Sequence, residues 1–133
     1  MIEIEYANIA YTLGRAKKYL DAIELHESEV WNEKKRVLEG ICELLVHSDP
    51  MRALIDGVED IVRVRVEADK FDNDCVTIRL FVPKLEGATG HDRIAYWDRI
   101  HRQAELYFHD RFAGGIMNYV NILVEEEDED MSK

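Results

Sequence analysis

Residues 62–82, VRVRVEADKFDNDCVTIRLFV, carry the clearest secondary-structure signal in the chain. Valine alternates with arginine and glutamate over residues 62–67, and apolar residues alternate again over residues 76–82. A period of two is typical of strands that bury one face. The stretch 69–74 between the two runs is rich in turn residues, and Pro83 ends the second run because proline cannot donate to a sheet. We therefore predict an antiparallel β-hairpin.

Helices are predicted on the N-terminal side of the hairpin. Apolar residues at steps of three and four predict an amphipathic helix over about residues 7–27, namely Ile9, Leu13, Ala16, Leu20 and Ile23. Ser28 is a suitable N-cap for a second helix that extends through Leu45. The two are expected to form an antiparallel helical hairpin, and one unbroken helix through Ser28 is the alternative. Pro50–Asp56 predicts a short third helix that ends at Gly57.

The C-terminal part predicts a long helix over residues 91–112, followed by a segment of ambiguous type. Residues 116–124 fit a strand or a helix, and the strand is favoured because an isolated hairpin is marginal and needs a third strand. The fold class is thus α+β, with an N-terminal helical hairpin, a central antiparallel β-hairpin that becomes a three-stranded sheet if 116–124 joins it, and a C-terminal amphipathic helix. One domain is expected over residues 1–124, and an acidic disordered tail over 125–133.

Charge is the unusual feature of the composition. The 133 residues include 17 Lys and Arg against 28 Asp and Glu, which gives a net charge of −11, and residues 1–124 alone carry −6. A field of this sign steers a protein toward basic surfaces and opposes direct binding to nucleic acid or to anionic lipid. The acidic N-terminus and the short apolar runs predict neither a signal peptide nor a membrane span. The two cysteines lack metal-site spacing, so a cytoplasmic protein without a cofactor is expected.

Acidic residues gather near the bend of the predicted helical hairpin. The candidate partner-binding face consists of Glu24, Glu27, Glu29 and Glu33. Its expected partner is a basic protein surface.

A second candidate is the solvent side of the β-hairpin. The alternation that buries the valines projects Arg63, Arg65, Arg79 and Phe81 the other way. Arginine binds carboxylate and phosphate groups through a planar fork, and an aromatic ring adds a stacking surface. The alternative is that these arginines pair with acids on neighbouring strands.

The third candidate is His101, which lies in the apolar stripe of the predicted C-terminal helix. Glu105 and His109 follow at one-turn spacing, and a buried histidine with a carboxylate partner can transfer protons. The two histidines are about 12 Å apart along the helix, too far for one metal ion to bind both directly. We expect no metal site, and a histidine satisfied within the core is the alternative to a functional one.

No catalytic motif is present in the sequence, so it predicts a binding protein rather than an enzyme. The leading hypothesis is a small acidic protein-binding module of inhibitor, immunity or adaptor type. One alternative is a small enzyme or ligand-binding domain that uses His101 and Glu105 or the arginine face. Another is a structural homo-oligomer, and a homodimer is compatible with either function. Its candidate interface is either the N-terminal helical hairpin or the aromatic-rich helix over 91–112, which carries Trp97, Tyr107, Phe108 and Phe112.

Overall fold

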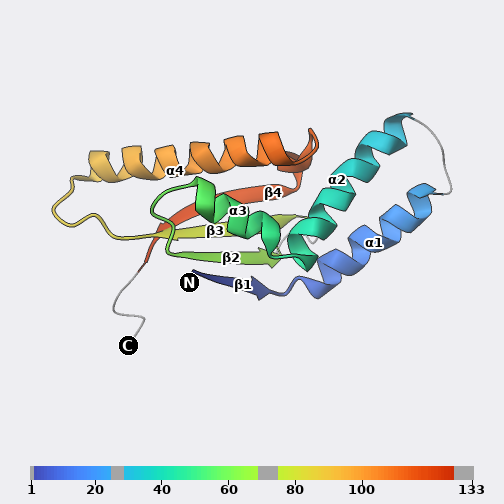
Figure 1. Cartoon of the computed structure of the whole chain (residues 1–133), viewed down its shortest axis with the longest axis horizontal. Coiled ribbons are helices and arrows are strands. Elements are labelled where there is room, and N and C mark those ends of the chain that lie inside the picture. The colour runs from blue at the N-terminus through green and yellow to red at the C-terminus, as the bar shows by residue number, and fades with distance from the viewer. Residues whose placement is uncertain (1, 25–28, 69–74, 128–133) are drawn as a thin grey trace.

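The computed structural model of the protein describes residues 2–24, 29–68 and 75–127. It has an α+β fold in which four α-helices accompany a four-stranded mixed sheet (Figure 1). The elements in chain order are β1 (Glu3–Ala7), α1 (Ala10–Glu24), α2 (Glu29–Val46), α3 (Asp49–Gly57), β2 (Arg63–Ala68), β3 (Val76–Val82), α4 (Gly90–Arg111), the 3-10 turn η1 (Ile116–Asn118) and β4 (Val120–Glu126).

The sheet has the strand order β1-β2-β3-β4. Its centre is the predicted hairpin: β2 and β3 are antiparallel, with Arg65 opposite Arg79. The prediction of a strand within residues 116–124 is confirmed, since β4 pairs in parallel with β3 after the η1 turn. The helix α4 connects these two parallel strands, so the sequence of β3, α4 and β4 is a strand–helix–strand crossover.

The sheet is larger than predicted because the N-terminus adds a strand. The predicted first helix began at about residue 7, whereas residues 3–7 form β1 and pair in parallel with β2. The backbone turns at Asn8, which has a left-handed φ of 56°, and α1 begins at Ala10. In the register of β1 with β2, Glu3 and Glu5 lie opposite the arginines Arg63 and Arg65. Such opposite-charge pairs stabilise the strand at this end, where the helical pattern of the sequence is weak.

The helical hairpin is confirmed, since α1 and α2 pack side by side at one end of the sheet (Figure 1). One unbroken helix over both segments is thereby excluded. The proposed N-cap Ser28 lies outside the described residues. The third helix is also confirmed, with Pro50 in its first turn and its end at Gly57.

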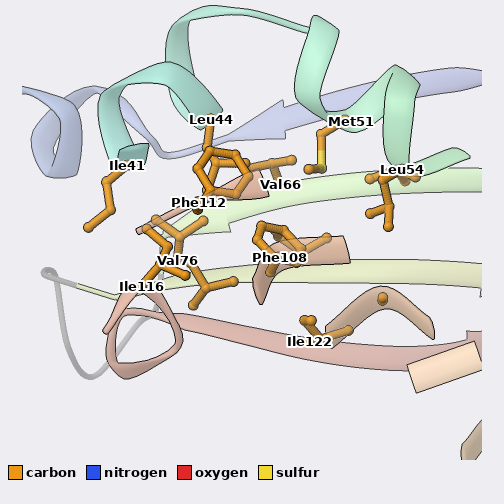
Figure 2. Close-up of a cluster of buried hydrophobic side chains, with 14 of the residues drawn as sticks. Ile41, Leu44, Met51, Leu54, Val66, Val76, Phe108, Phe112, Ile116 and Ile122 are labelled. Atoms are coloured by element: carbon orange, nitrogen blue, oxygen red, sulfur yellow. The ribbon is translucent and has the colours of Figure 1, made fainter. Parts of the chain in front are cut away.

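The core lies between the sheet and the helices α2, α3 and α4. Figure 2 shows how side chains from these elements meet over the strands. Leu44 of α2, Leu54 of α3, Phe108 of α4 and Val66 of β2 are fully buried there, and Ile122 of β4 is 5% exposed. Burial of each such side chain contributes about 1.5–3 kcal/mol.

Helix α4 begins at a side-chain cap. Thr89 and Asp92 form a capping box at its start, and the helix buries Ile100, Ala104 and Phe108 along one side. Ile94, near the start of the same helix, is 63% exposed.

The acidic C-terminal run begins inside the sheet. Glu125 and Glu126, which the sequence assigned to the tail, belong to β4, and the amide of Glu127 donates to the carbonyl of Val82 at 2.7 Å. Residues 128–133 of the predicted tail lie outside the described residues.

Candidate functional site

The solvent face of the sheet holds the predicted arginines. Strand register places Arg63 opposite Phe81 and Arg65 opposite Arg79, so these four residues share one face of the hairpin. The other face carries Val64, Val66, Ile78 and Leu80, which are fully buried in the core. The surroundings of the three arginines and Phe81 show what each one is available to bind.

Arg79 lies at the centre of this face and joins three strands. Its Nε contacts Glu67 of β2, and its Nη1 contacts Glu125 of β4. The hydrogen bond with Glu67 raises the pKa of Arg79 above its ordinary value, so the guanidinium stays charged. An anionic ligand at Arg79 would have to displace two carboxylates.

The side chains of Arg63 and Arg65 also contact acidic side chains. Arg63 lies 3.6 Å from Glu5 and 3.5 Å from Glu127, and its guanidinium covers the ring of Phe81 at 4.0 Å from the centroid. Phe81 is 8% exposed, so its ring is not a stacking platform for a ligand. Arg65 lies 3.3 Å from Glu67. Arg63 and Arg79 thus contact acids outside their own strands, as the alternative expected, whereas Arg65 pairs with an acid on its own strand β2.

His101 uses both of its ring nitrogens within the chain. Nδ1 lies 2.7 Å from Oε1 of Glu105, one turn further along α4. Nε2 lies 3.0 Å from the carbonyl oxygen of Ile122 in β4. General-base catalysis requires a ring nitrogen that is open to a substrate proton. Both ring nitrogens of His101 are thus engaged, one with its own helix α4 and the other with strand β4.

A groove of about 680 Å³ brings two of the sequence candidates together at the edge of the sheet. It contains His101, Glu105 and His109 from α4, and it reaches Arg79 and Glu67 of the arginine face. This proximity could not be predicted from local sequence patterns, because it depends on β4 lying beside α4. Within the described part of the chain, no group of three or more His, Cys, Asp or Glu side chains is arranged to hold a metal ion.

The candidate acidic face is described only in part. Glu24 and Glu29 lie at facing ends of α1 and α2, and Glu27 lies outside the described residues. Glu33 is exposed on α2.

Glu33 lines a second groove, of about 650 Å³, between α2 and the end of α4. We call it the acidic groove, and its lining residues are Asn32, Glu33, Arg36, Glu39, Gly40, Glu43, Arg111, Phe112, Ala113 and Gly114.

Three carboxylates of α2 line the acidic groove, and sequence reasoning identified only one of them. Glu43 accepts a hydrogen bond of 2.6 Å from Nη2 of Arg111, and Glu39 lies 4.0 Å from Lys35. No ion pair joins Glu33 to another of the described residues. The spacing of four between Glu39 and Glu43 would have indicated a shared face for those two acids, whereas Glu33 lies roughly 120° around the helix from Glu39.

The floor of the acidic groove is apolar and rigid. A Cβ on Gly40 would lie 3.1 Å from Cδ1 of Phe112, so glycine permits the close approach of the two segments. The ring of Phe112 stacks on Phe108 with centroids 5.4 Å apart and is 9% exposed. Two aromatic residues predicted for an oligomer interface, Phe108 and Phe112, are therefore buried within the chain.

None of the helices formed by the described residues is both long enough and apolar enough to cross a membrane. Comparison of the chain with protein-family models, with curated proteins and with solved structures finds no match.

Proposed function

We propose that the chain is a small acidic protein-binding module whose acidic groove takes a basic segment of a partner protein. The observation that carries this proposal is a groove of about 650 Å³ lined by Glu33, Glu39 and Glu43. Two guanidiniums also line it, and that of Arg111 is already paired with Glu43. Glu33 and Glu39 are the carboxylates most available to a partner.

The shape of the acidic groove suits a lysine or arginine side chain. Such side chains combine an apolar stem with a charged head. Ala113, which is half-buried, provides an apolar surface for the stem, while Glu33 and Glu39 are exposed on α2 for the head. The net charge of −11 supports the same class of partner, because it accelerates the approach of basic surfaces.

The test is the binding of a fluorescein-labelled oligolysine peptide, followed by fluorescence anisotropy at several salt concentrations. Glu33→Gln/Glu39→Gln should weaken binding about tenfold, equivalent to about 1.4 kcal/mol. Glu59→Gln/Glu86→Gln is the matched control, because it removes two exposed carboxylates that do not line the groove. An acetylated peptide without ammonium charges should not bind.

Equal weakening by the two double variants would reject the acidic groove and leave only a general effect of net charge. Absence of binding by the unmodified protein would also reject the proposal. Circular dichroism and light scattering on every variant establish that fold and assembly are unchanged.

A further inference from the structure

Exposed aromatic rings and cations alternate along one surface of the helical hairpin. We call this surface the aromatic–cationic row, and its residues are Tyr11, Arg15, Tyr19, Lys34 and Trp31. The first three recur at steps of four along α1, which places them on one face of that helix. The last two come from α2, which packs beside α1.

Each cation of the row lies within reach of two rings. The guanidinium carbon of Arg15 is 5.8 Å from the ring centroid of Tyr11 and 5.7 Å from that of Tyr19. The Nζ of Lys34 is 6.0 Å from the ring centroid of Tyr19 and 5.9 Å from that of Trp31. These distances are typical of cation–π contacts, so the row is a continuous arrangement that spans both helices.

The rings of the row are accessible from solvent. Tyr11 is 60% exposed, Tyr19 is 44% exposed and Trp31 is 41% exposed. A small cavity of about 120 Å³ opens beside Tyr19 and Lys34, and apolar side chains such as Leu38 line it. Exposed rings beside an apolar cavity are typical of a surface that binds a ligand with flat apolar groups.

Local charge around the row differs from that of the whole chain. Residues 10–46 contain six basic and seven acidic side chains, so their net charge is −1 in a chain of −11. Three of these acids, Glu33, Glu39 and Glu43, line the acidic groove on another side of α2. The five residues of the row itself include two cations, Arg15 and Lys34, and no carboxylate.

We propose that the aromatic–cationic row binds a single strand of nucleic acid. Unpaired bases would stack on the rings of Tyr11, Tyr19 and Trp31, and phosphates would contact Arg15 and Lys34. Exposed rings combined with cations along one surface are the arrangement that binds single strands without sequence preference. This proposal departs from the expectation drawn from net charge, because net charge averages over the chain and hides a local row of cations.

The combination of rings and cations distinguishes this ligand from other polyanions. An acidic peptide would use Arg15 and Lys34 but would leave the three rings without a flat partner. A duplex would offer phosphates, but its bases would already be stacked on one another. The row lies outside the acidic groove, so the two binding proposals are independent of each other.

The test is the binding of fluorescein-labelled oligonucleotides of about 12 unpaired nucleotides, one of deoxythymidine and one of uridine, to the full chain. Arg15→Gln/Lys34→Gln and Tyr11→Ala/Trp31→Ala should each weaken binding by about tenfold or more. Arg52→Gln/Lys84→Gln is the matched control for charge, since both residues are exposed and lie outside the row. A Trp97→Phe variant leaves Trp31 as its one tryptophan, and its emission should be quenched when bases stack on the ring.

Three results would overturn the proposal: no binding of either oligonucleotide, equal weakening by the control variant, or equal affinity for a duplex of the same length. Displacement of the oligonucleotide by polyglutamate at equal charge concentration would show that the row is a site for acidic peptides. Circular dichroism of each variant verifies its fold, and the conservative Tyr11→Phe/Trp31→Phe variant should retain binding if stacking is the cause.

Discussion

The imidazole of His101 joins helix α4 to the edge strand β4, with Nε2 3.0 Å from the carbonyl oxygen of Ile122. Among the strands of the described residues, β4 pairs with β3 alone, and the carbonyl of Tyr119 is among the groups that bond to β3. In a parallel ladder alternate residues point toward the partner strand, so the carbonyl of Ile122 faces the open edge. His101 satisfies this carbonyl, and α4 thereby covers an edge at which another strand could add.

Replacing this histidine should loosen the edge of the sheet. His101→Leu removes the hydrogen bond to Ile122 and should lower the free energy of unfolding by about 1 kcal/mol. Glu105→Gln, which removes only the charge of a half-exposed partner, should cost less. Urea unfolding measures both, with His109→Leu on the exposed side of α4 as control. If the two histidine variants lose equal stability, the contact with Ile122 is not what stabilises this edge.

Two glycines within helices provide a test of close packing. At Gly40 an added Cβ would lie 3.1 Å from Phe112 and 3.4 Å from Ile116, both buried. Gly40→Ala should therefore destabilise the protein by about 1–2 kcal/mol, because the cost of overpacking exceeds the gain in helix propensity. Gly14→Ala in α1 meets no atom within 4 Å and should stabilise by up to about 1 kcal/mol. Thermal unfolding of the two variants should shift in opposite directions, and a stabilised Gly40→Ala protein would show that Phe112 can move aside.

The helices and the hairpin could be predicted because their periodic patterns are local. The strand β1 was missed, although Ile2, Ile4 and Tyr6 alternate with Glu3 and Glu5, because a five-residue strand at a terminus gives little signal. Strand pairing with β2 determines its structure, and such pairing is a property of distant residues.

The sequence predicts which side chains belong to the candidate sites, but it does not predict what those side chains contact. The direction of Arg79 followed from strand alternation, whereas its contacts with Glu67 and Glu125 depend on the position of β4. The acidic groove depends on the end of α4 lying against α2, and no local pattern reports that contact. The physical cause is the same in both cases: tertiary packing brings together residues that are far apart in the sequence.

The ion pairs of Arg79 predict that its replacement lowers the stability of the protein. Arg79→Met keeps the apolar stem but leaves the carboxylates of Glu67 and Glu125 without their shared cation. The free energy of unfolding should fall by roughly 1–3 kcal/mol, as for hydrogen bonds to charged groups. Arg102→Met, which removes an exposed pair with Asp98, should change it by less than about 0.5 kcal/mol. Adding Glu67→Gln to Arg79→Met should restore part of the loss, and the absence of any restoration would show that charge is not the cause.

The phenol of Tyr96 predicts how stability changes at high pH. Burial, together with a hydrogen bond and the negative charge of Asp60, raises the pKa of Tyr96 from 10.0 to about 12. Since the unfolded chain releases this proton at lower pH than the folded chain, the contribution of Tyr96 to stability is complete below pH 10. It is lost as the pH rises toward about 12. Tyr96→Phe should therefore lose less stability than the unmodified protein over this interval, as urea unfolding would show.

A second measurement is the near-ultraviolet absorbance of tyrosinate as the pH is raised. The component that appears at the highest pH should be missing in Tyr96→Phe, and it should remain in the control variant Tyr11→Phe, which changes an exposed tyrosine. A Tyr96→Phe protein whose stability falls in parallel with that of the unmodified chain would contradict the link between this phenol and Asp60.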